Sequence, residues 1–271
     1  MAGVLVGLVG DLEGERDAAV RWLRALGNRG DVQVVFQLGD LRFGMGPEPQ
    51  AYLAAIDQVC ARYDLELYGI NGNHENWDEL DRRWRAPASV DAEGRLAPLA
   101  VTDRVTLLPR GHRWSLGGRT FVALGGAPSI NRHLLTEGVD WWPSEVVLDE
   151  HVDAVVAGGY ADVMLTHDSP SAPWCTPPVA EILRRNADDN PSDWPQSSLD
   201  DAEEGLARMT RAVLGVRPAF LAHGHFHVAG EAVVQLPSAD HRTTIWSLAA
   251  RQDEGTVRVL DLDTLAEAHR P

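Results

Sequence analysis

A short apolar run, residues 65–70, leads into Asn73-His74, a pair that combines a carboxamide oxygen with an imidazole. A carboxamide oxygen can bind a metal ion, and an imidazole can bind a metal or donate a proton near neutral pH. Taken alone, such a pair in a turn is more often a turn former beside a solvated histidine. A metal-binding role for the pair is favoured because four other apolar runs also end in side chains that can bind metal.

These metal-capable side chains share one position, since each lies just after an apolar run of strand length. Carboxylates and imidazoles bind divalent first-row metals, and one carboxylate can bridge two ions about 3.5 to 4 Å apart. In open α/β sheets, ligands gather at the carboxyl ends of strands. Five such coincidences favour a two-metal site over five unrelated turns. The candidate ligands are Asp11, Glu13, Asp40, Asn73, His167, His225 and His227.

The elements that must position these residues alternate between strand-like and helical patterns along the chain. Apolar runs followed by loops and helical periodicity indicate strand-loop-helix units, and a segment around Gly117-Gly118 indicates a hairpin. This alternation is typical of an α/β or α+β sandwich. Strands are expected at 4–9, 32–38, 65–70, 104–108, 112–116, 119–124, 163–166 and 219–222.

The second half of the chain gives three further expectations. A helix is predicted from Ser144 to Val156, with Ser144 as its N-cap. Segment 171–198, rich in Pro, Ser, Asp and Asn, is expected to be a surface excursion with a short helix near 179–185. The final apolar runs indicate a three-stranded antiparallel finish at 231–236, 243–248 and 256–260.

Composition limits the classes of protein that the chain can form. Its 271 residues, 44% of them hydrophobic, can bury the core of a single domain spanning 1–271. All 24 basic residues are arginine, and the net charge of −16 argues against a broad surface for duplex nucleic acid or an anionic membrane. Two cysteines provide no disulfide framework, and no apolar run approaches the roughly 18 residues that cross a bilayer. The lack of a disulfide framework fits a reducing cytoplasm, and the first ten residues, without a basic leader or a small-residue cleavage site, are expected to form a core strand and not a signal peptide.

The ordered set of motifs resembles the calcineurin-like metallophosphoesterase superfamily. The resemblance implies a four-layer αββα sandwich of two mixed β-sheets flanked by helices. It also implies a dinuclear metal centre between the sheets, at the carboxyl ends of the strands. The motifs that carry it are Asp11-Leu12-Glu13-Gly14, Gly39-Asp40, Gly72-Asn73-His74-Glu75, His167 and Gly224-His225-Phe226-His227.

Carried over by position, the resemblance assigns a role to each of these residues. Asp40 would bridge the two ions, and His74 would be the catalytic acid near the leaving group. Glu75, the next residue, could orient or protonate His74, or could be a surface turn carboxylate. The other ligands would be Asp11 and His227 at the first ion, and Asn73, His167 and His225 at the second.

Glu13 departs from the family pattern, which usually has histidine at this position. A glutamate adds a hard oxygen and a negative charge, which favours Mn²⁺, Fe²⁺ or Mg²⁺ over Zn²⁺ at the first position. The alternative is that the side chain of Glu13 points away from the metal, so that the first position binds its ion weakly. The expected cofactors are two divalent ions, with Mn²⁺ preferred and Fe²⁺, Zn²⁺, Ni²⁺ or Mg²⁺ as alternatives.

The residues then favour hydrolysis of a phosphoester by a hydroxide shared between the two metals. Arg132 and His133 could hold a phosphate oxygen that does not react. Trp141 or Trp142 could stack on a ring of the substrate, or could fill the edge of the core. The expected substrate is a small soluble phosphodiester or phosphomonoester, or a nucleotide.

Two other functions remain open at this point. The chain could be a nuclease component acting on single-stranded nucleic acid, because a narrow groove can be basic while the whole protein is acidic. It could also be a catalytically inactive protein-binding scaffold of the same fold, with Glu13 as a sign of decay. The intact cluster argues against the scaffold, since like charges kept together without metal are costly.

Overall fold

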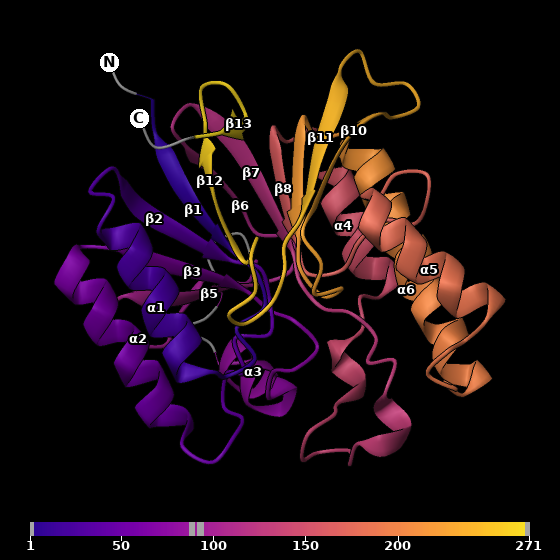
Figure 1. The fold of residues 1–271 in the computed structure, drawn as a ribbon, viewed down its shortest axis with the longest axis horizontal. Coiled ribbons are helices and arrows are strands. Elements are labelled where there is room, and N and C mark those ends of the chain that lie inside the picture. Colours follow the sequence, from indigo (N-terminus) through magenta and orange to yellow (C-terminus); the bar gives the residue numbers. More distant parts are fainter. Residues whose placement is uncertain (1–2, 87–89, 91–94, 269–271) are drawn as a thin grey trace.

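Two mixed β-sheets packed face to face form the centre of the protein, and helices cover the outer face of each sheet (Figure 1). The computed structural model describes residues 3–86, 90 and 95–268. In spatial order, the larger sheet contains β13 (Ala266–Glu267), β12 (Val257–Asp261), β1 (Leu5–Val9), β2 (Val32–Gln37), β3 (Glu66–Ile70), β5 (Val105–Leu108) and β4 (Leu99–Ala100). The smaller sheet contains β10 (Gly230–Gln235), β11 (Arg242–Ser247), β9 (Phe220–His223), β8 (Val163–Thr166), β7 (Arg119–Leu124) and β6 (Arg113–Leu116).

The helices divide between the two outer faces of the sandwich. Those nearest the larger sheet are α1 (Arg16–Gly27), α2 (Pro49–Tyr63) and α3 (Trp77–Trp84). Those on the side of the smaller sheet are α4 (Asp149–Ala157), α5 (Pro177–Asp188) and α6 (Gln196–Val216). Two 3-10 turns lie between β7 and α4, namely η2 (Arg132–Leu134) and η3 (Pro143–Glu145). This arrangement confirms the four-layer αββα sandwich predicted from the sequence. In the described residues, no helix has the length and apolar character that crossing a membrane requires.

Three apolar layers hold the sandwich together. The middle layer lies between the sheets, where the ring of Phe36 contacts those of Tyr68, Trp114 and Phe121. A second layer lies between the larger sheet and helices α1 and α2, and a third between the smaller sheet and helices α4 and α6. Because the central strands β1, β8 and β9 are buried along nearly their whole length, a polar site is favoured where these strands end.

The strands that precede the candidate ligands run parallel to their neighbours. β1, β2 and β3 are parallel in the larger sheet, and β8 and β9 are parallel in the smaller one. Parallel strands buried on both faces read as nearly continuous apolar runs, which is why the sequence marks them so clearly. Their shared direction brings their carboxyl ends to the same edge of each sheet.

The C-terminal strands do not form the three-stranded antiparallel sheet expected from the sequence, and that prediction was wrong. β10 and β11 are antiparallel, but β11 also runs parallel to β9. β12 lies in the other sheet, antiparallel to β1. Val259 and Leu260 pack on opposite faces of the larger sheet, so an apolar pattern identified the strand without identifying its partner.

The helix expected from Ser144 begins at Asp149, so that boundary was also wrong. Pro143–Glu145 forms a 3-10 turn, and the backbone N–H of Leu148, which precedes the helix, donates to Nδ1 of His151 at 3.0 Å. The carboxylate of Glu145 is buried and accepts hydrogen bonds from the loop after β7. These tertiary contacts hold residues 143–145 in place outside the helix.

Candidate metal centre

Five strands deliver the predicted site residues to one edge of the sandwich. Three of these strands belong to the larger sheet and two to the smaller sheet, so the site joins both sheets. The residues that follow the strands are Asp11 and Glu13 after β1, Asp40 after β2, Asn73 and His74 after β3, His167 after β8, and His225 and His227 after β9.

One ligand cluster contains three carboxylates and an imidazole. Asp11, Glu13, Asp40 and His227 each place one ligand atom within 4.8 Å of the others. Nε2 of His227 lies 3.0 Å from Oδ2 of Asp11 and 3.3 Å from Oε1 of Glu13. Glu13 therefore points into the cluster, and the alternative that its side chain swings away does not describe the structure. All three carboxylates are buried.

The pKa values of this cluster reflect burial and mutual contact. Burial raises the pKa of Asp11 to about 7, although its hydrogen bond with His227 lowers it. The same hydrogen bond and that with Glu13 raise the pKa of His227 to about 10. Burial also raises the pKa of Asp40, against the opposing attraction of His74. The cluster therefore favours a compensating positive charge between its carboxylates.

A second ligand cluster surrounds the imidazole of His167. Nδ1 of this ring lies 2.8 Å from the carbonyl oxygen of Leu38, so Nδ1 carries the proton and donates it there. Burial lowers the pKa of His167 to about 3, which keeps the ring neutral and leaves a lone pair on Nε2. That Nε2 lies 2.9 Å from Oδ1 of Asn73 and 3.4 Å from Oδ1 of Asp40. The ring of His225 is 5.0 Å from that of His167, between centroids.

The orientation of Asn73 is set by a chain of hydrogen bonds that the sequence did not reveal. Nδ2 of Asn73 donates to Oγ of Ser129 at 3.0 Å, and this hydroxyl donates to Oε2 of Glu145 at 3.0 Å. Oε1 of Glu145 accepts the N–H of Ser129 at 2.6 Å and Nε1–H of Trp141 at 2.9 Å. Because the amide nitrogen is committed to Ser129, the carboxamide oxygen faces His167. Ser129 follows the carboxyl end of β7, and this position is the one signal that could have identified it.

His74 lies between the carboxylate cluster and the adjoining cavity. Its Nδ1 is 3.1 Å from Oε2 of Glu13 and 3.4 Å from Oδ2 of Asp40, and its backbone N–H donates to Oδ1 of Asp40 at 2.8 Å. Burial lowers the pKa of His74, but attraction to Asp40 and Glu13 outweighs this effect and raises the pKa to about 9. The contacts with Glu13 and Asp40 therefore favour the protonated form of the ring, which borders the cavity.

Glu75 fastens two loops together. Its carboxylate accepts backbone hydrogen bonds from Leu41 at 2.9 Å, Phe43 at 2.5 Å and Gly72 at 3.4 Å. Because these donors lie in the loops after β2 and β3, Glu75 fixes Asp40 relative to Asn73. Its carboxylate is buried, so of the two roles left open by the sequence, the surface turn carboxylate does not describe it.

The backbone of the site adopts conformations that are rare for its residue types. Glu13, Asp40, His225 and His227 have φ between 53° and 66°, a left-handed region that clusters at functional sites when non-glycine residues occupy it. Gly39, at φ of 107°, also leaves room for a neighbour, because a Cβ there would collide with the ring of His167. The surrounding contacts hold these residues in conformations that they would rarely adopt alone.

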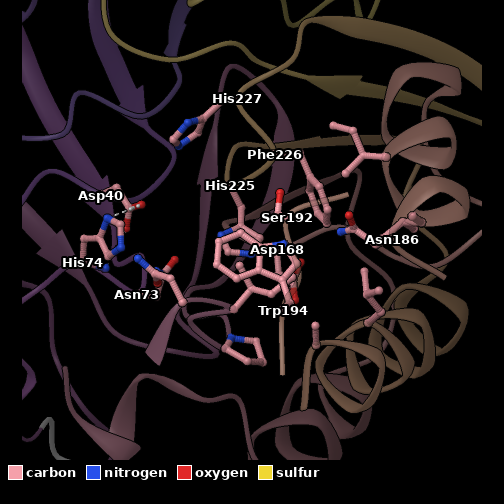
Figure 2. A pocket seen from close by; sticks show the side chains of 17 residues that line it. Asp40, Asn73, His74, Asp168, Asn186, Ser192, Trp194, His225, Phe226 and His227 are labelled. Carbon is pink, nitrogen blue, oxygen red and sulfur yellow. Dashed lines mark hydrogen bonds and ion pairs between the residues drawn. The ribbon is translucent and has the colours of Figure 1, made fainter. Parts of the chain in front are cut away.

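A cavity of about 440 Å³ adjoins both clusters (Figure 2). Asp40, Asn73 and His74 lie on one side of it, with Asn186 and Phe226 on the other. Segment 171–198, predicted to be a surface excursion with a helix near 179–185, contains α5 at Pro177–Asp188, and side chains of α5 line this cavity. The segment thus contributes a wall of the site.

The residues predicted to contact substrate lie elsewhere. Arg132 forms an ion pair with Asp201, and the ring of His133 packs edge-on against Trp194 with centroids 6.0 Å apart. Neither belongs to the described residues that line the cavity, so their predicted role in holding phosphate remains a prediction. Of the two tryptophans considered for stacking, Trp142 is buried in the core, and Trp141 donates to Glu145.

Comparison with known proteins identifies the family. The profile described as calcineurin-like phosphoesterase matches residues 4–229. The chain belongs to this family. The resemblance stated from the sequence motifs is thereby confirmed. No curated protein matches the chain.

Two solved structures match the chain at low sequence identity. A dimetal phosphatase from Danio rerio is 13% identical, with a TM-score of 0.53, and the match covers 96% of this chain and 93% of that one. A hypothetical protein from Thermus thermophilus is 16% identical with a TM-score of 0.43, covering 91% of this chain and 76% of that one. At such identity, the likeness to the dimetal phosphatase shows the fold alone.

Calcineurin-like phosphoesterases use a dinuclear divalent metal centre, and the residues of this chain fit one. Around His167, an imidazole lone pair, a carboxamide oxygen and a carboxylate oxygen converge, and all three are acceptors. Oδ1 of Asp11 is buried and has no hydrogen-bond partner among the described residues. A cation would satisfy both sets of atoms. The family thus supports metal-dependent hydrolysis of phosphoesters in general.

Ser129→Ala should weaken metal binding at the Asn73 side of the centre by about 10- to 100-fold, because the carboxamide loses the partner that orients it. Calorimetric titration of metal-stripped protein with Mn²⁺ would measure the affinity of each of the two ions, and only one of these affinities should fall. Ser247→Ala is the matched control, since it removes a buried hydroxyl that contacts Thr176. Equal affinities in Ser129→Ala and wild-type protein would contradict the role of this hydrogen-bond chain.

Glu13→His should shift metal preference towards Zn²⁺, because imidazole replaces a hard carboxylate oxygen and removes one negative charge. Metal analysis after equilibration with equal concentrations of Mn²⁺ and Zn²⁺ would give the ratio bound. Glu15→His is the control, since Glu15 lies in the same loop outside the described cluster and is partly exposed. An unchanged ratio in Glu13→His would show that Glu13 is not a ligand.

Proposed function

We propose that this protein hydrolyses monoanionic phosphodiesters of small organic alcohols by direct attack of water. The observation that carries the proposal is that metal-capable side chains from five strand ends lie together, and that Asp40, Asn73, His225 and His227 among them line a cavity that His74 also borders. When bound, two divalent cations would neutralise phosphoryl oxygens and lower the pKa of a coordinated water to roughly 7. The ligands proposed for them are Asp11, Glu13, Asp40, Asn73, His167, His225 and His227.

His74 is proposed as the catalytic acid. Its side chain is 19% exposed and lines the cavity, while Glu13 and Asp40 hold its ring from behind. A proton donated from this position would neutralise the leaving alkoxide. General acid catalysis of this kind contributes on the order of 10² to 10⁴ in rate.

The charge of the cavity wall supports a diester over a monoester. Among the described residues that line the cavity, none is arginine, and the whole chain contains no lysine. A phosphomonoester carries a second negative charge, for which arginine is a frequent partner. A diester carries a single charge and presents an organic substituent in place of the second oxygen anion. The cavity offers that substituent room beyond the ligand clusters.

Mn²⁺ is proposed as the preferred metal, with Fe²⁺, Zn²⁺, Ni²⁺ or Mg²⁺ as alternatives. Three carboxylates contribute to the first cluster, and oxygen ligands suit hard cations such as Mn²⁺. The second cluster has more imidazole and one carboxamide, a set that also accepts Fe²⁺ or Zn²⁺. The location of Glu13 within the first cluster supports this preference.

The proposal is tested by hydrolysis of bis-p-nitrophenyl phosphate and p-nitrophenyl phosphate by chelator-stripped protein, with each of the five metals added back. We expect metal to restore turnover, with kcat/KM for the diester at least about 10-fold above that for the monoester, about 1.4 kcal/mol in the barrier. Asp40→Asn, which loses the proposed bridging carboxylate, should show little restoration. A preference for the monoester would overturn the diester assignment. No turnover by folded, metal-replete protein would favour a scaffold.

His74→Ala should retain both metals and lower kcat by about 10² to 10⁴, because the leaving group loses its proton donor. The loss should be larger for phenyl esters than for p-nitrophenyl esters, since the poorer leaving group depends more on protonation. Metal content and kcat for the two esters measure these effects. Loss of metal in His74→Ala would instead identify His74 as a ligand.

A further inference from the structure

We infer that α5, the loop before α6 and the first half of α6 form a subsite for an uncharged aromatic group of the substrate, with Trp194 as its stacking surface. This inference rests on the proposed function, because it concerns the organic substituent of the same phosphodiester. It also names a substrate class that the family does not specify, namely a phosphodiester with a nucleoside-like ring that carries N–H or O–H donors.

The subsite is continuous with the metal clusters. A single cavity is lined by Asn73 and His225 in the clusters and by Trp194 in the loop before α6 (Figure 2). Its volume of about 440 Å³ lies within the range of small-molecule sites, roughly 300 to 1,000 Å³. A phosphate held at the ligand clusters would therefore direct one substituent towards Trp194.

The wall around Trp194 is largely apolar. Ile182 and Leu183 come from α5, and Leu206 comes from α6. Phe226 lines the same cavity from the loop after β9. Apolar and aromatic side chains of this kind bind rings by burying their faces, whereas a phosphate or sugar acid would lose hydration without gaining a partner.

Trp194 is held in place by the protein itself. The side chain of Asn190 donates to the carbonyl oxygen of Trp194 at 2.8 Å and accepts its backbone N–H at 2.9 Å. The ring of His133 contacts the indole edge-on, with centroids 6.0 Å apart. A ring that is already positioned loses little conformational entropy when a ligand stacks on it. His133 therefore acts on the subsite through Trp194 without lining the cavity.

Polar groups in the wall select the chemistry of the ring. Asn131 and Asn186 present carboxamides to the cavity, and Asp168 presents a buried carboxylate. Oδ1 of Asp168 accepts the N–H of Ser169 at 2.8 Å. The carboxyl and carboxamide oxygens in the wall can accept hydrogen bonds from N–H or O–H donors of a ligand. The set suits an uncharged ring that carries donors, as a nucleoside does.

Binding of slowly hydrolysed diesters tests this inference without relying on turnover. Calorimetry with Mn²⁺-replete protein compares methyl phenyl phosphate with dimethyl phosphate, which has the same charge and no ring. We expect the phenyl ester to bind about 10-fold more tightly. A third probe, methyl 4-carboxyphenyl phosphate, adds one negative charge to the ring and should bind more weakly than the phenyl ester.

Variants assign the preference to Trp194. Trp194→Ala should bring the affinities for methyl phenyl phosphate and dimethyl phosphate close together. Trp194→Phe should keep most of the difference between these affinities, because it retains an aromatic ring. Trp174→Ala is the matched control. Trp174 also lies in segment 171–198, but it packs against the apolar layer between the smaller sheet and its helices. It should leave the phenyl preference unchanged.

The outcomes separate this inference from the proposed function. Equal binding of the phenyl and methyl esters by wild-type protein would overturn the aromatic subsite, whether or not the protein hydrolyses diesters. A phenyl preference that survives in Trp194→Ala would overturn the assignment to Trp194. Selective binding that depends on Trp194, without turnover of any diester, would support the subsite and overturn the hydrolytic function.

Discussion

Three buried carboxylates, those of Asp11, Glu13 and Asp40, face one another and would repel strongly without positive charge between them. His227 and His74 supply part of that charge through direct contacts. Two divalent cations would supply the rest. The rest of the site holds these like charges close together. Part of the free-energy cost is the left-handed backbone conformation of Glu13 and Asp40, which non-glycine residues rarely adopt.

Both sheets contribute residues that hold the buried carboxylates in place. Asp11 belongs to the larger sheet and accepts the backbone N–H of His225, which follows a strand of the smaller sheet, at 2.9 Å. His167, also from the smaller sheet, approaches Asp40 and Asn73 of the larger one. The centre therefore fastens the sheets to each other at the edge where their parallel strands end. Any shift of one sheet over the other would separate the ligands.

The proposed chemistry and the proposed selectivity depend on different parts of the chain. The ligands lie at the ends of rigid, buried strands, while the far wall of the cavity comes from α5, α6 and the loop that carries Trp194. Strand ends keep ligand geometry constant, whereas loops and outer helices can change without disturbing the core. Under the proposed function, this division would combine a metal centre of the family with a substrate pocket particular to this chain.

The sequence by itself determined the family, the sandwich and the convergence of side chains such as Asp40, because parallel strands buried on both faces appear as apolar runs and their ends must meet. Only the tertiary structure decided that β12 joins the larger sheet, that Ser129 and Glu145 orient Asn73, and that Trp194 lines the cavity. An apolar pattern reports which faces of one element are buried. It carries no record of contacts between distant segments, which depend on how the completed layers pack together.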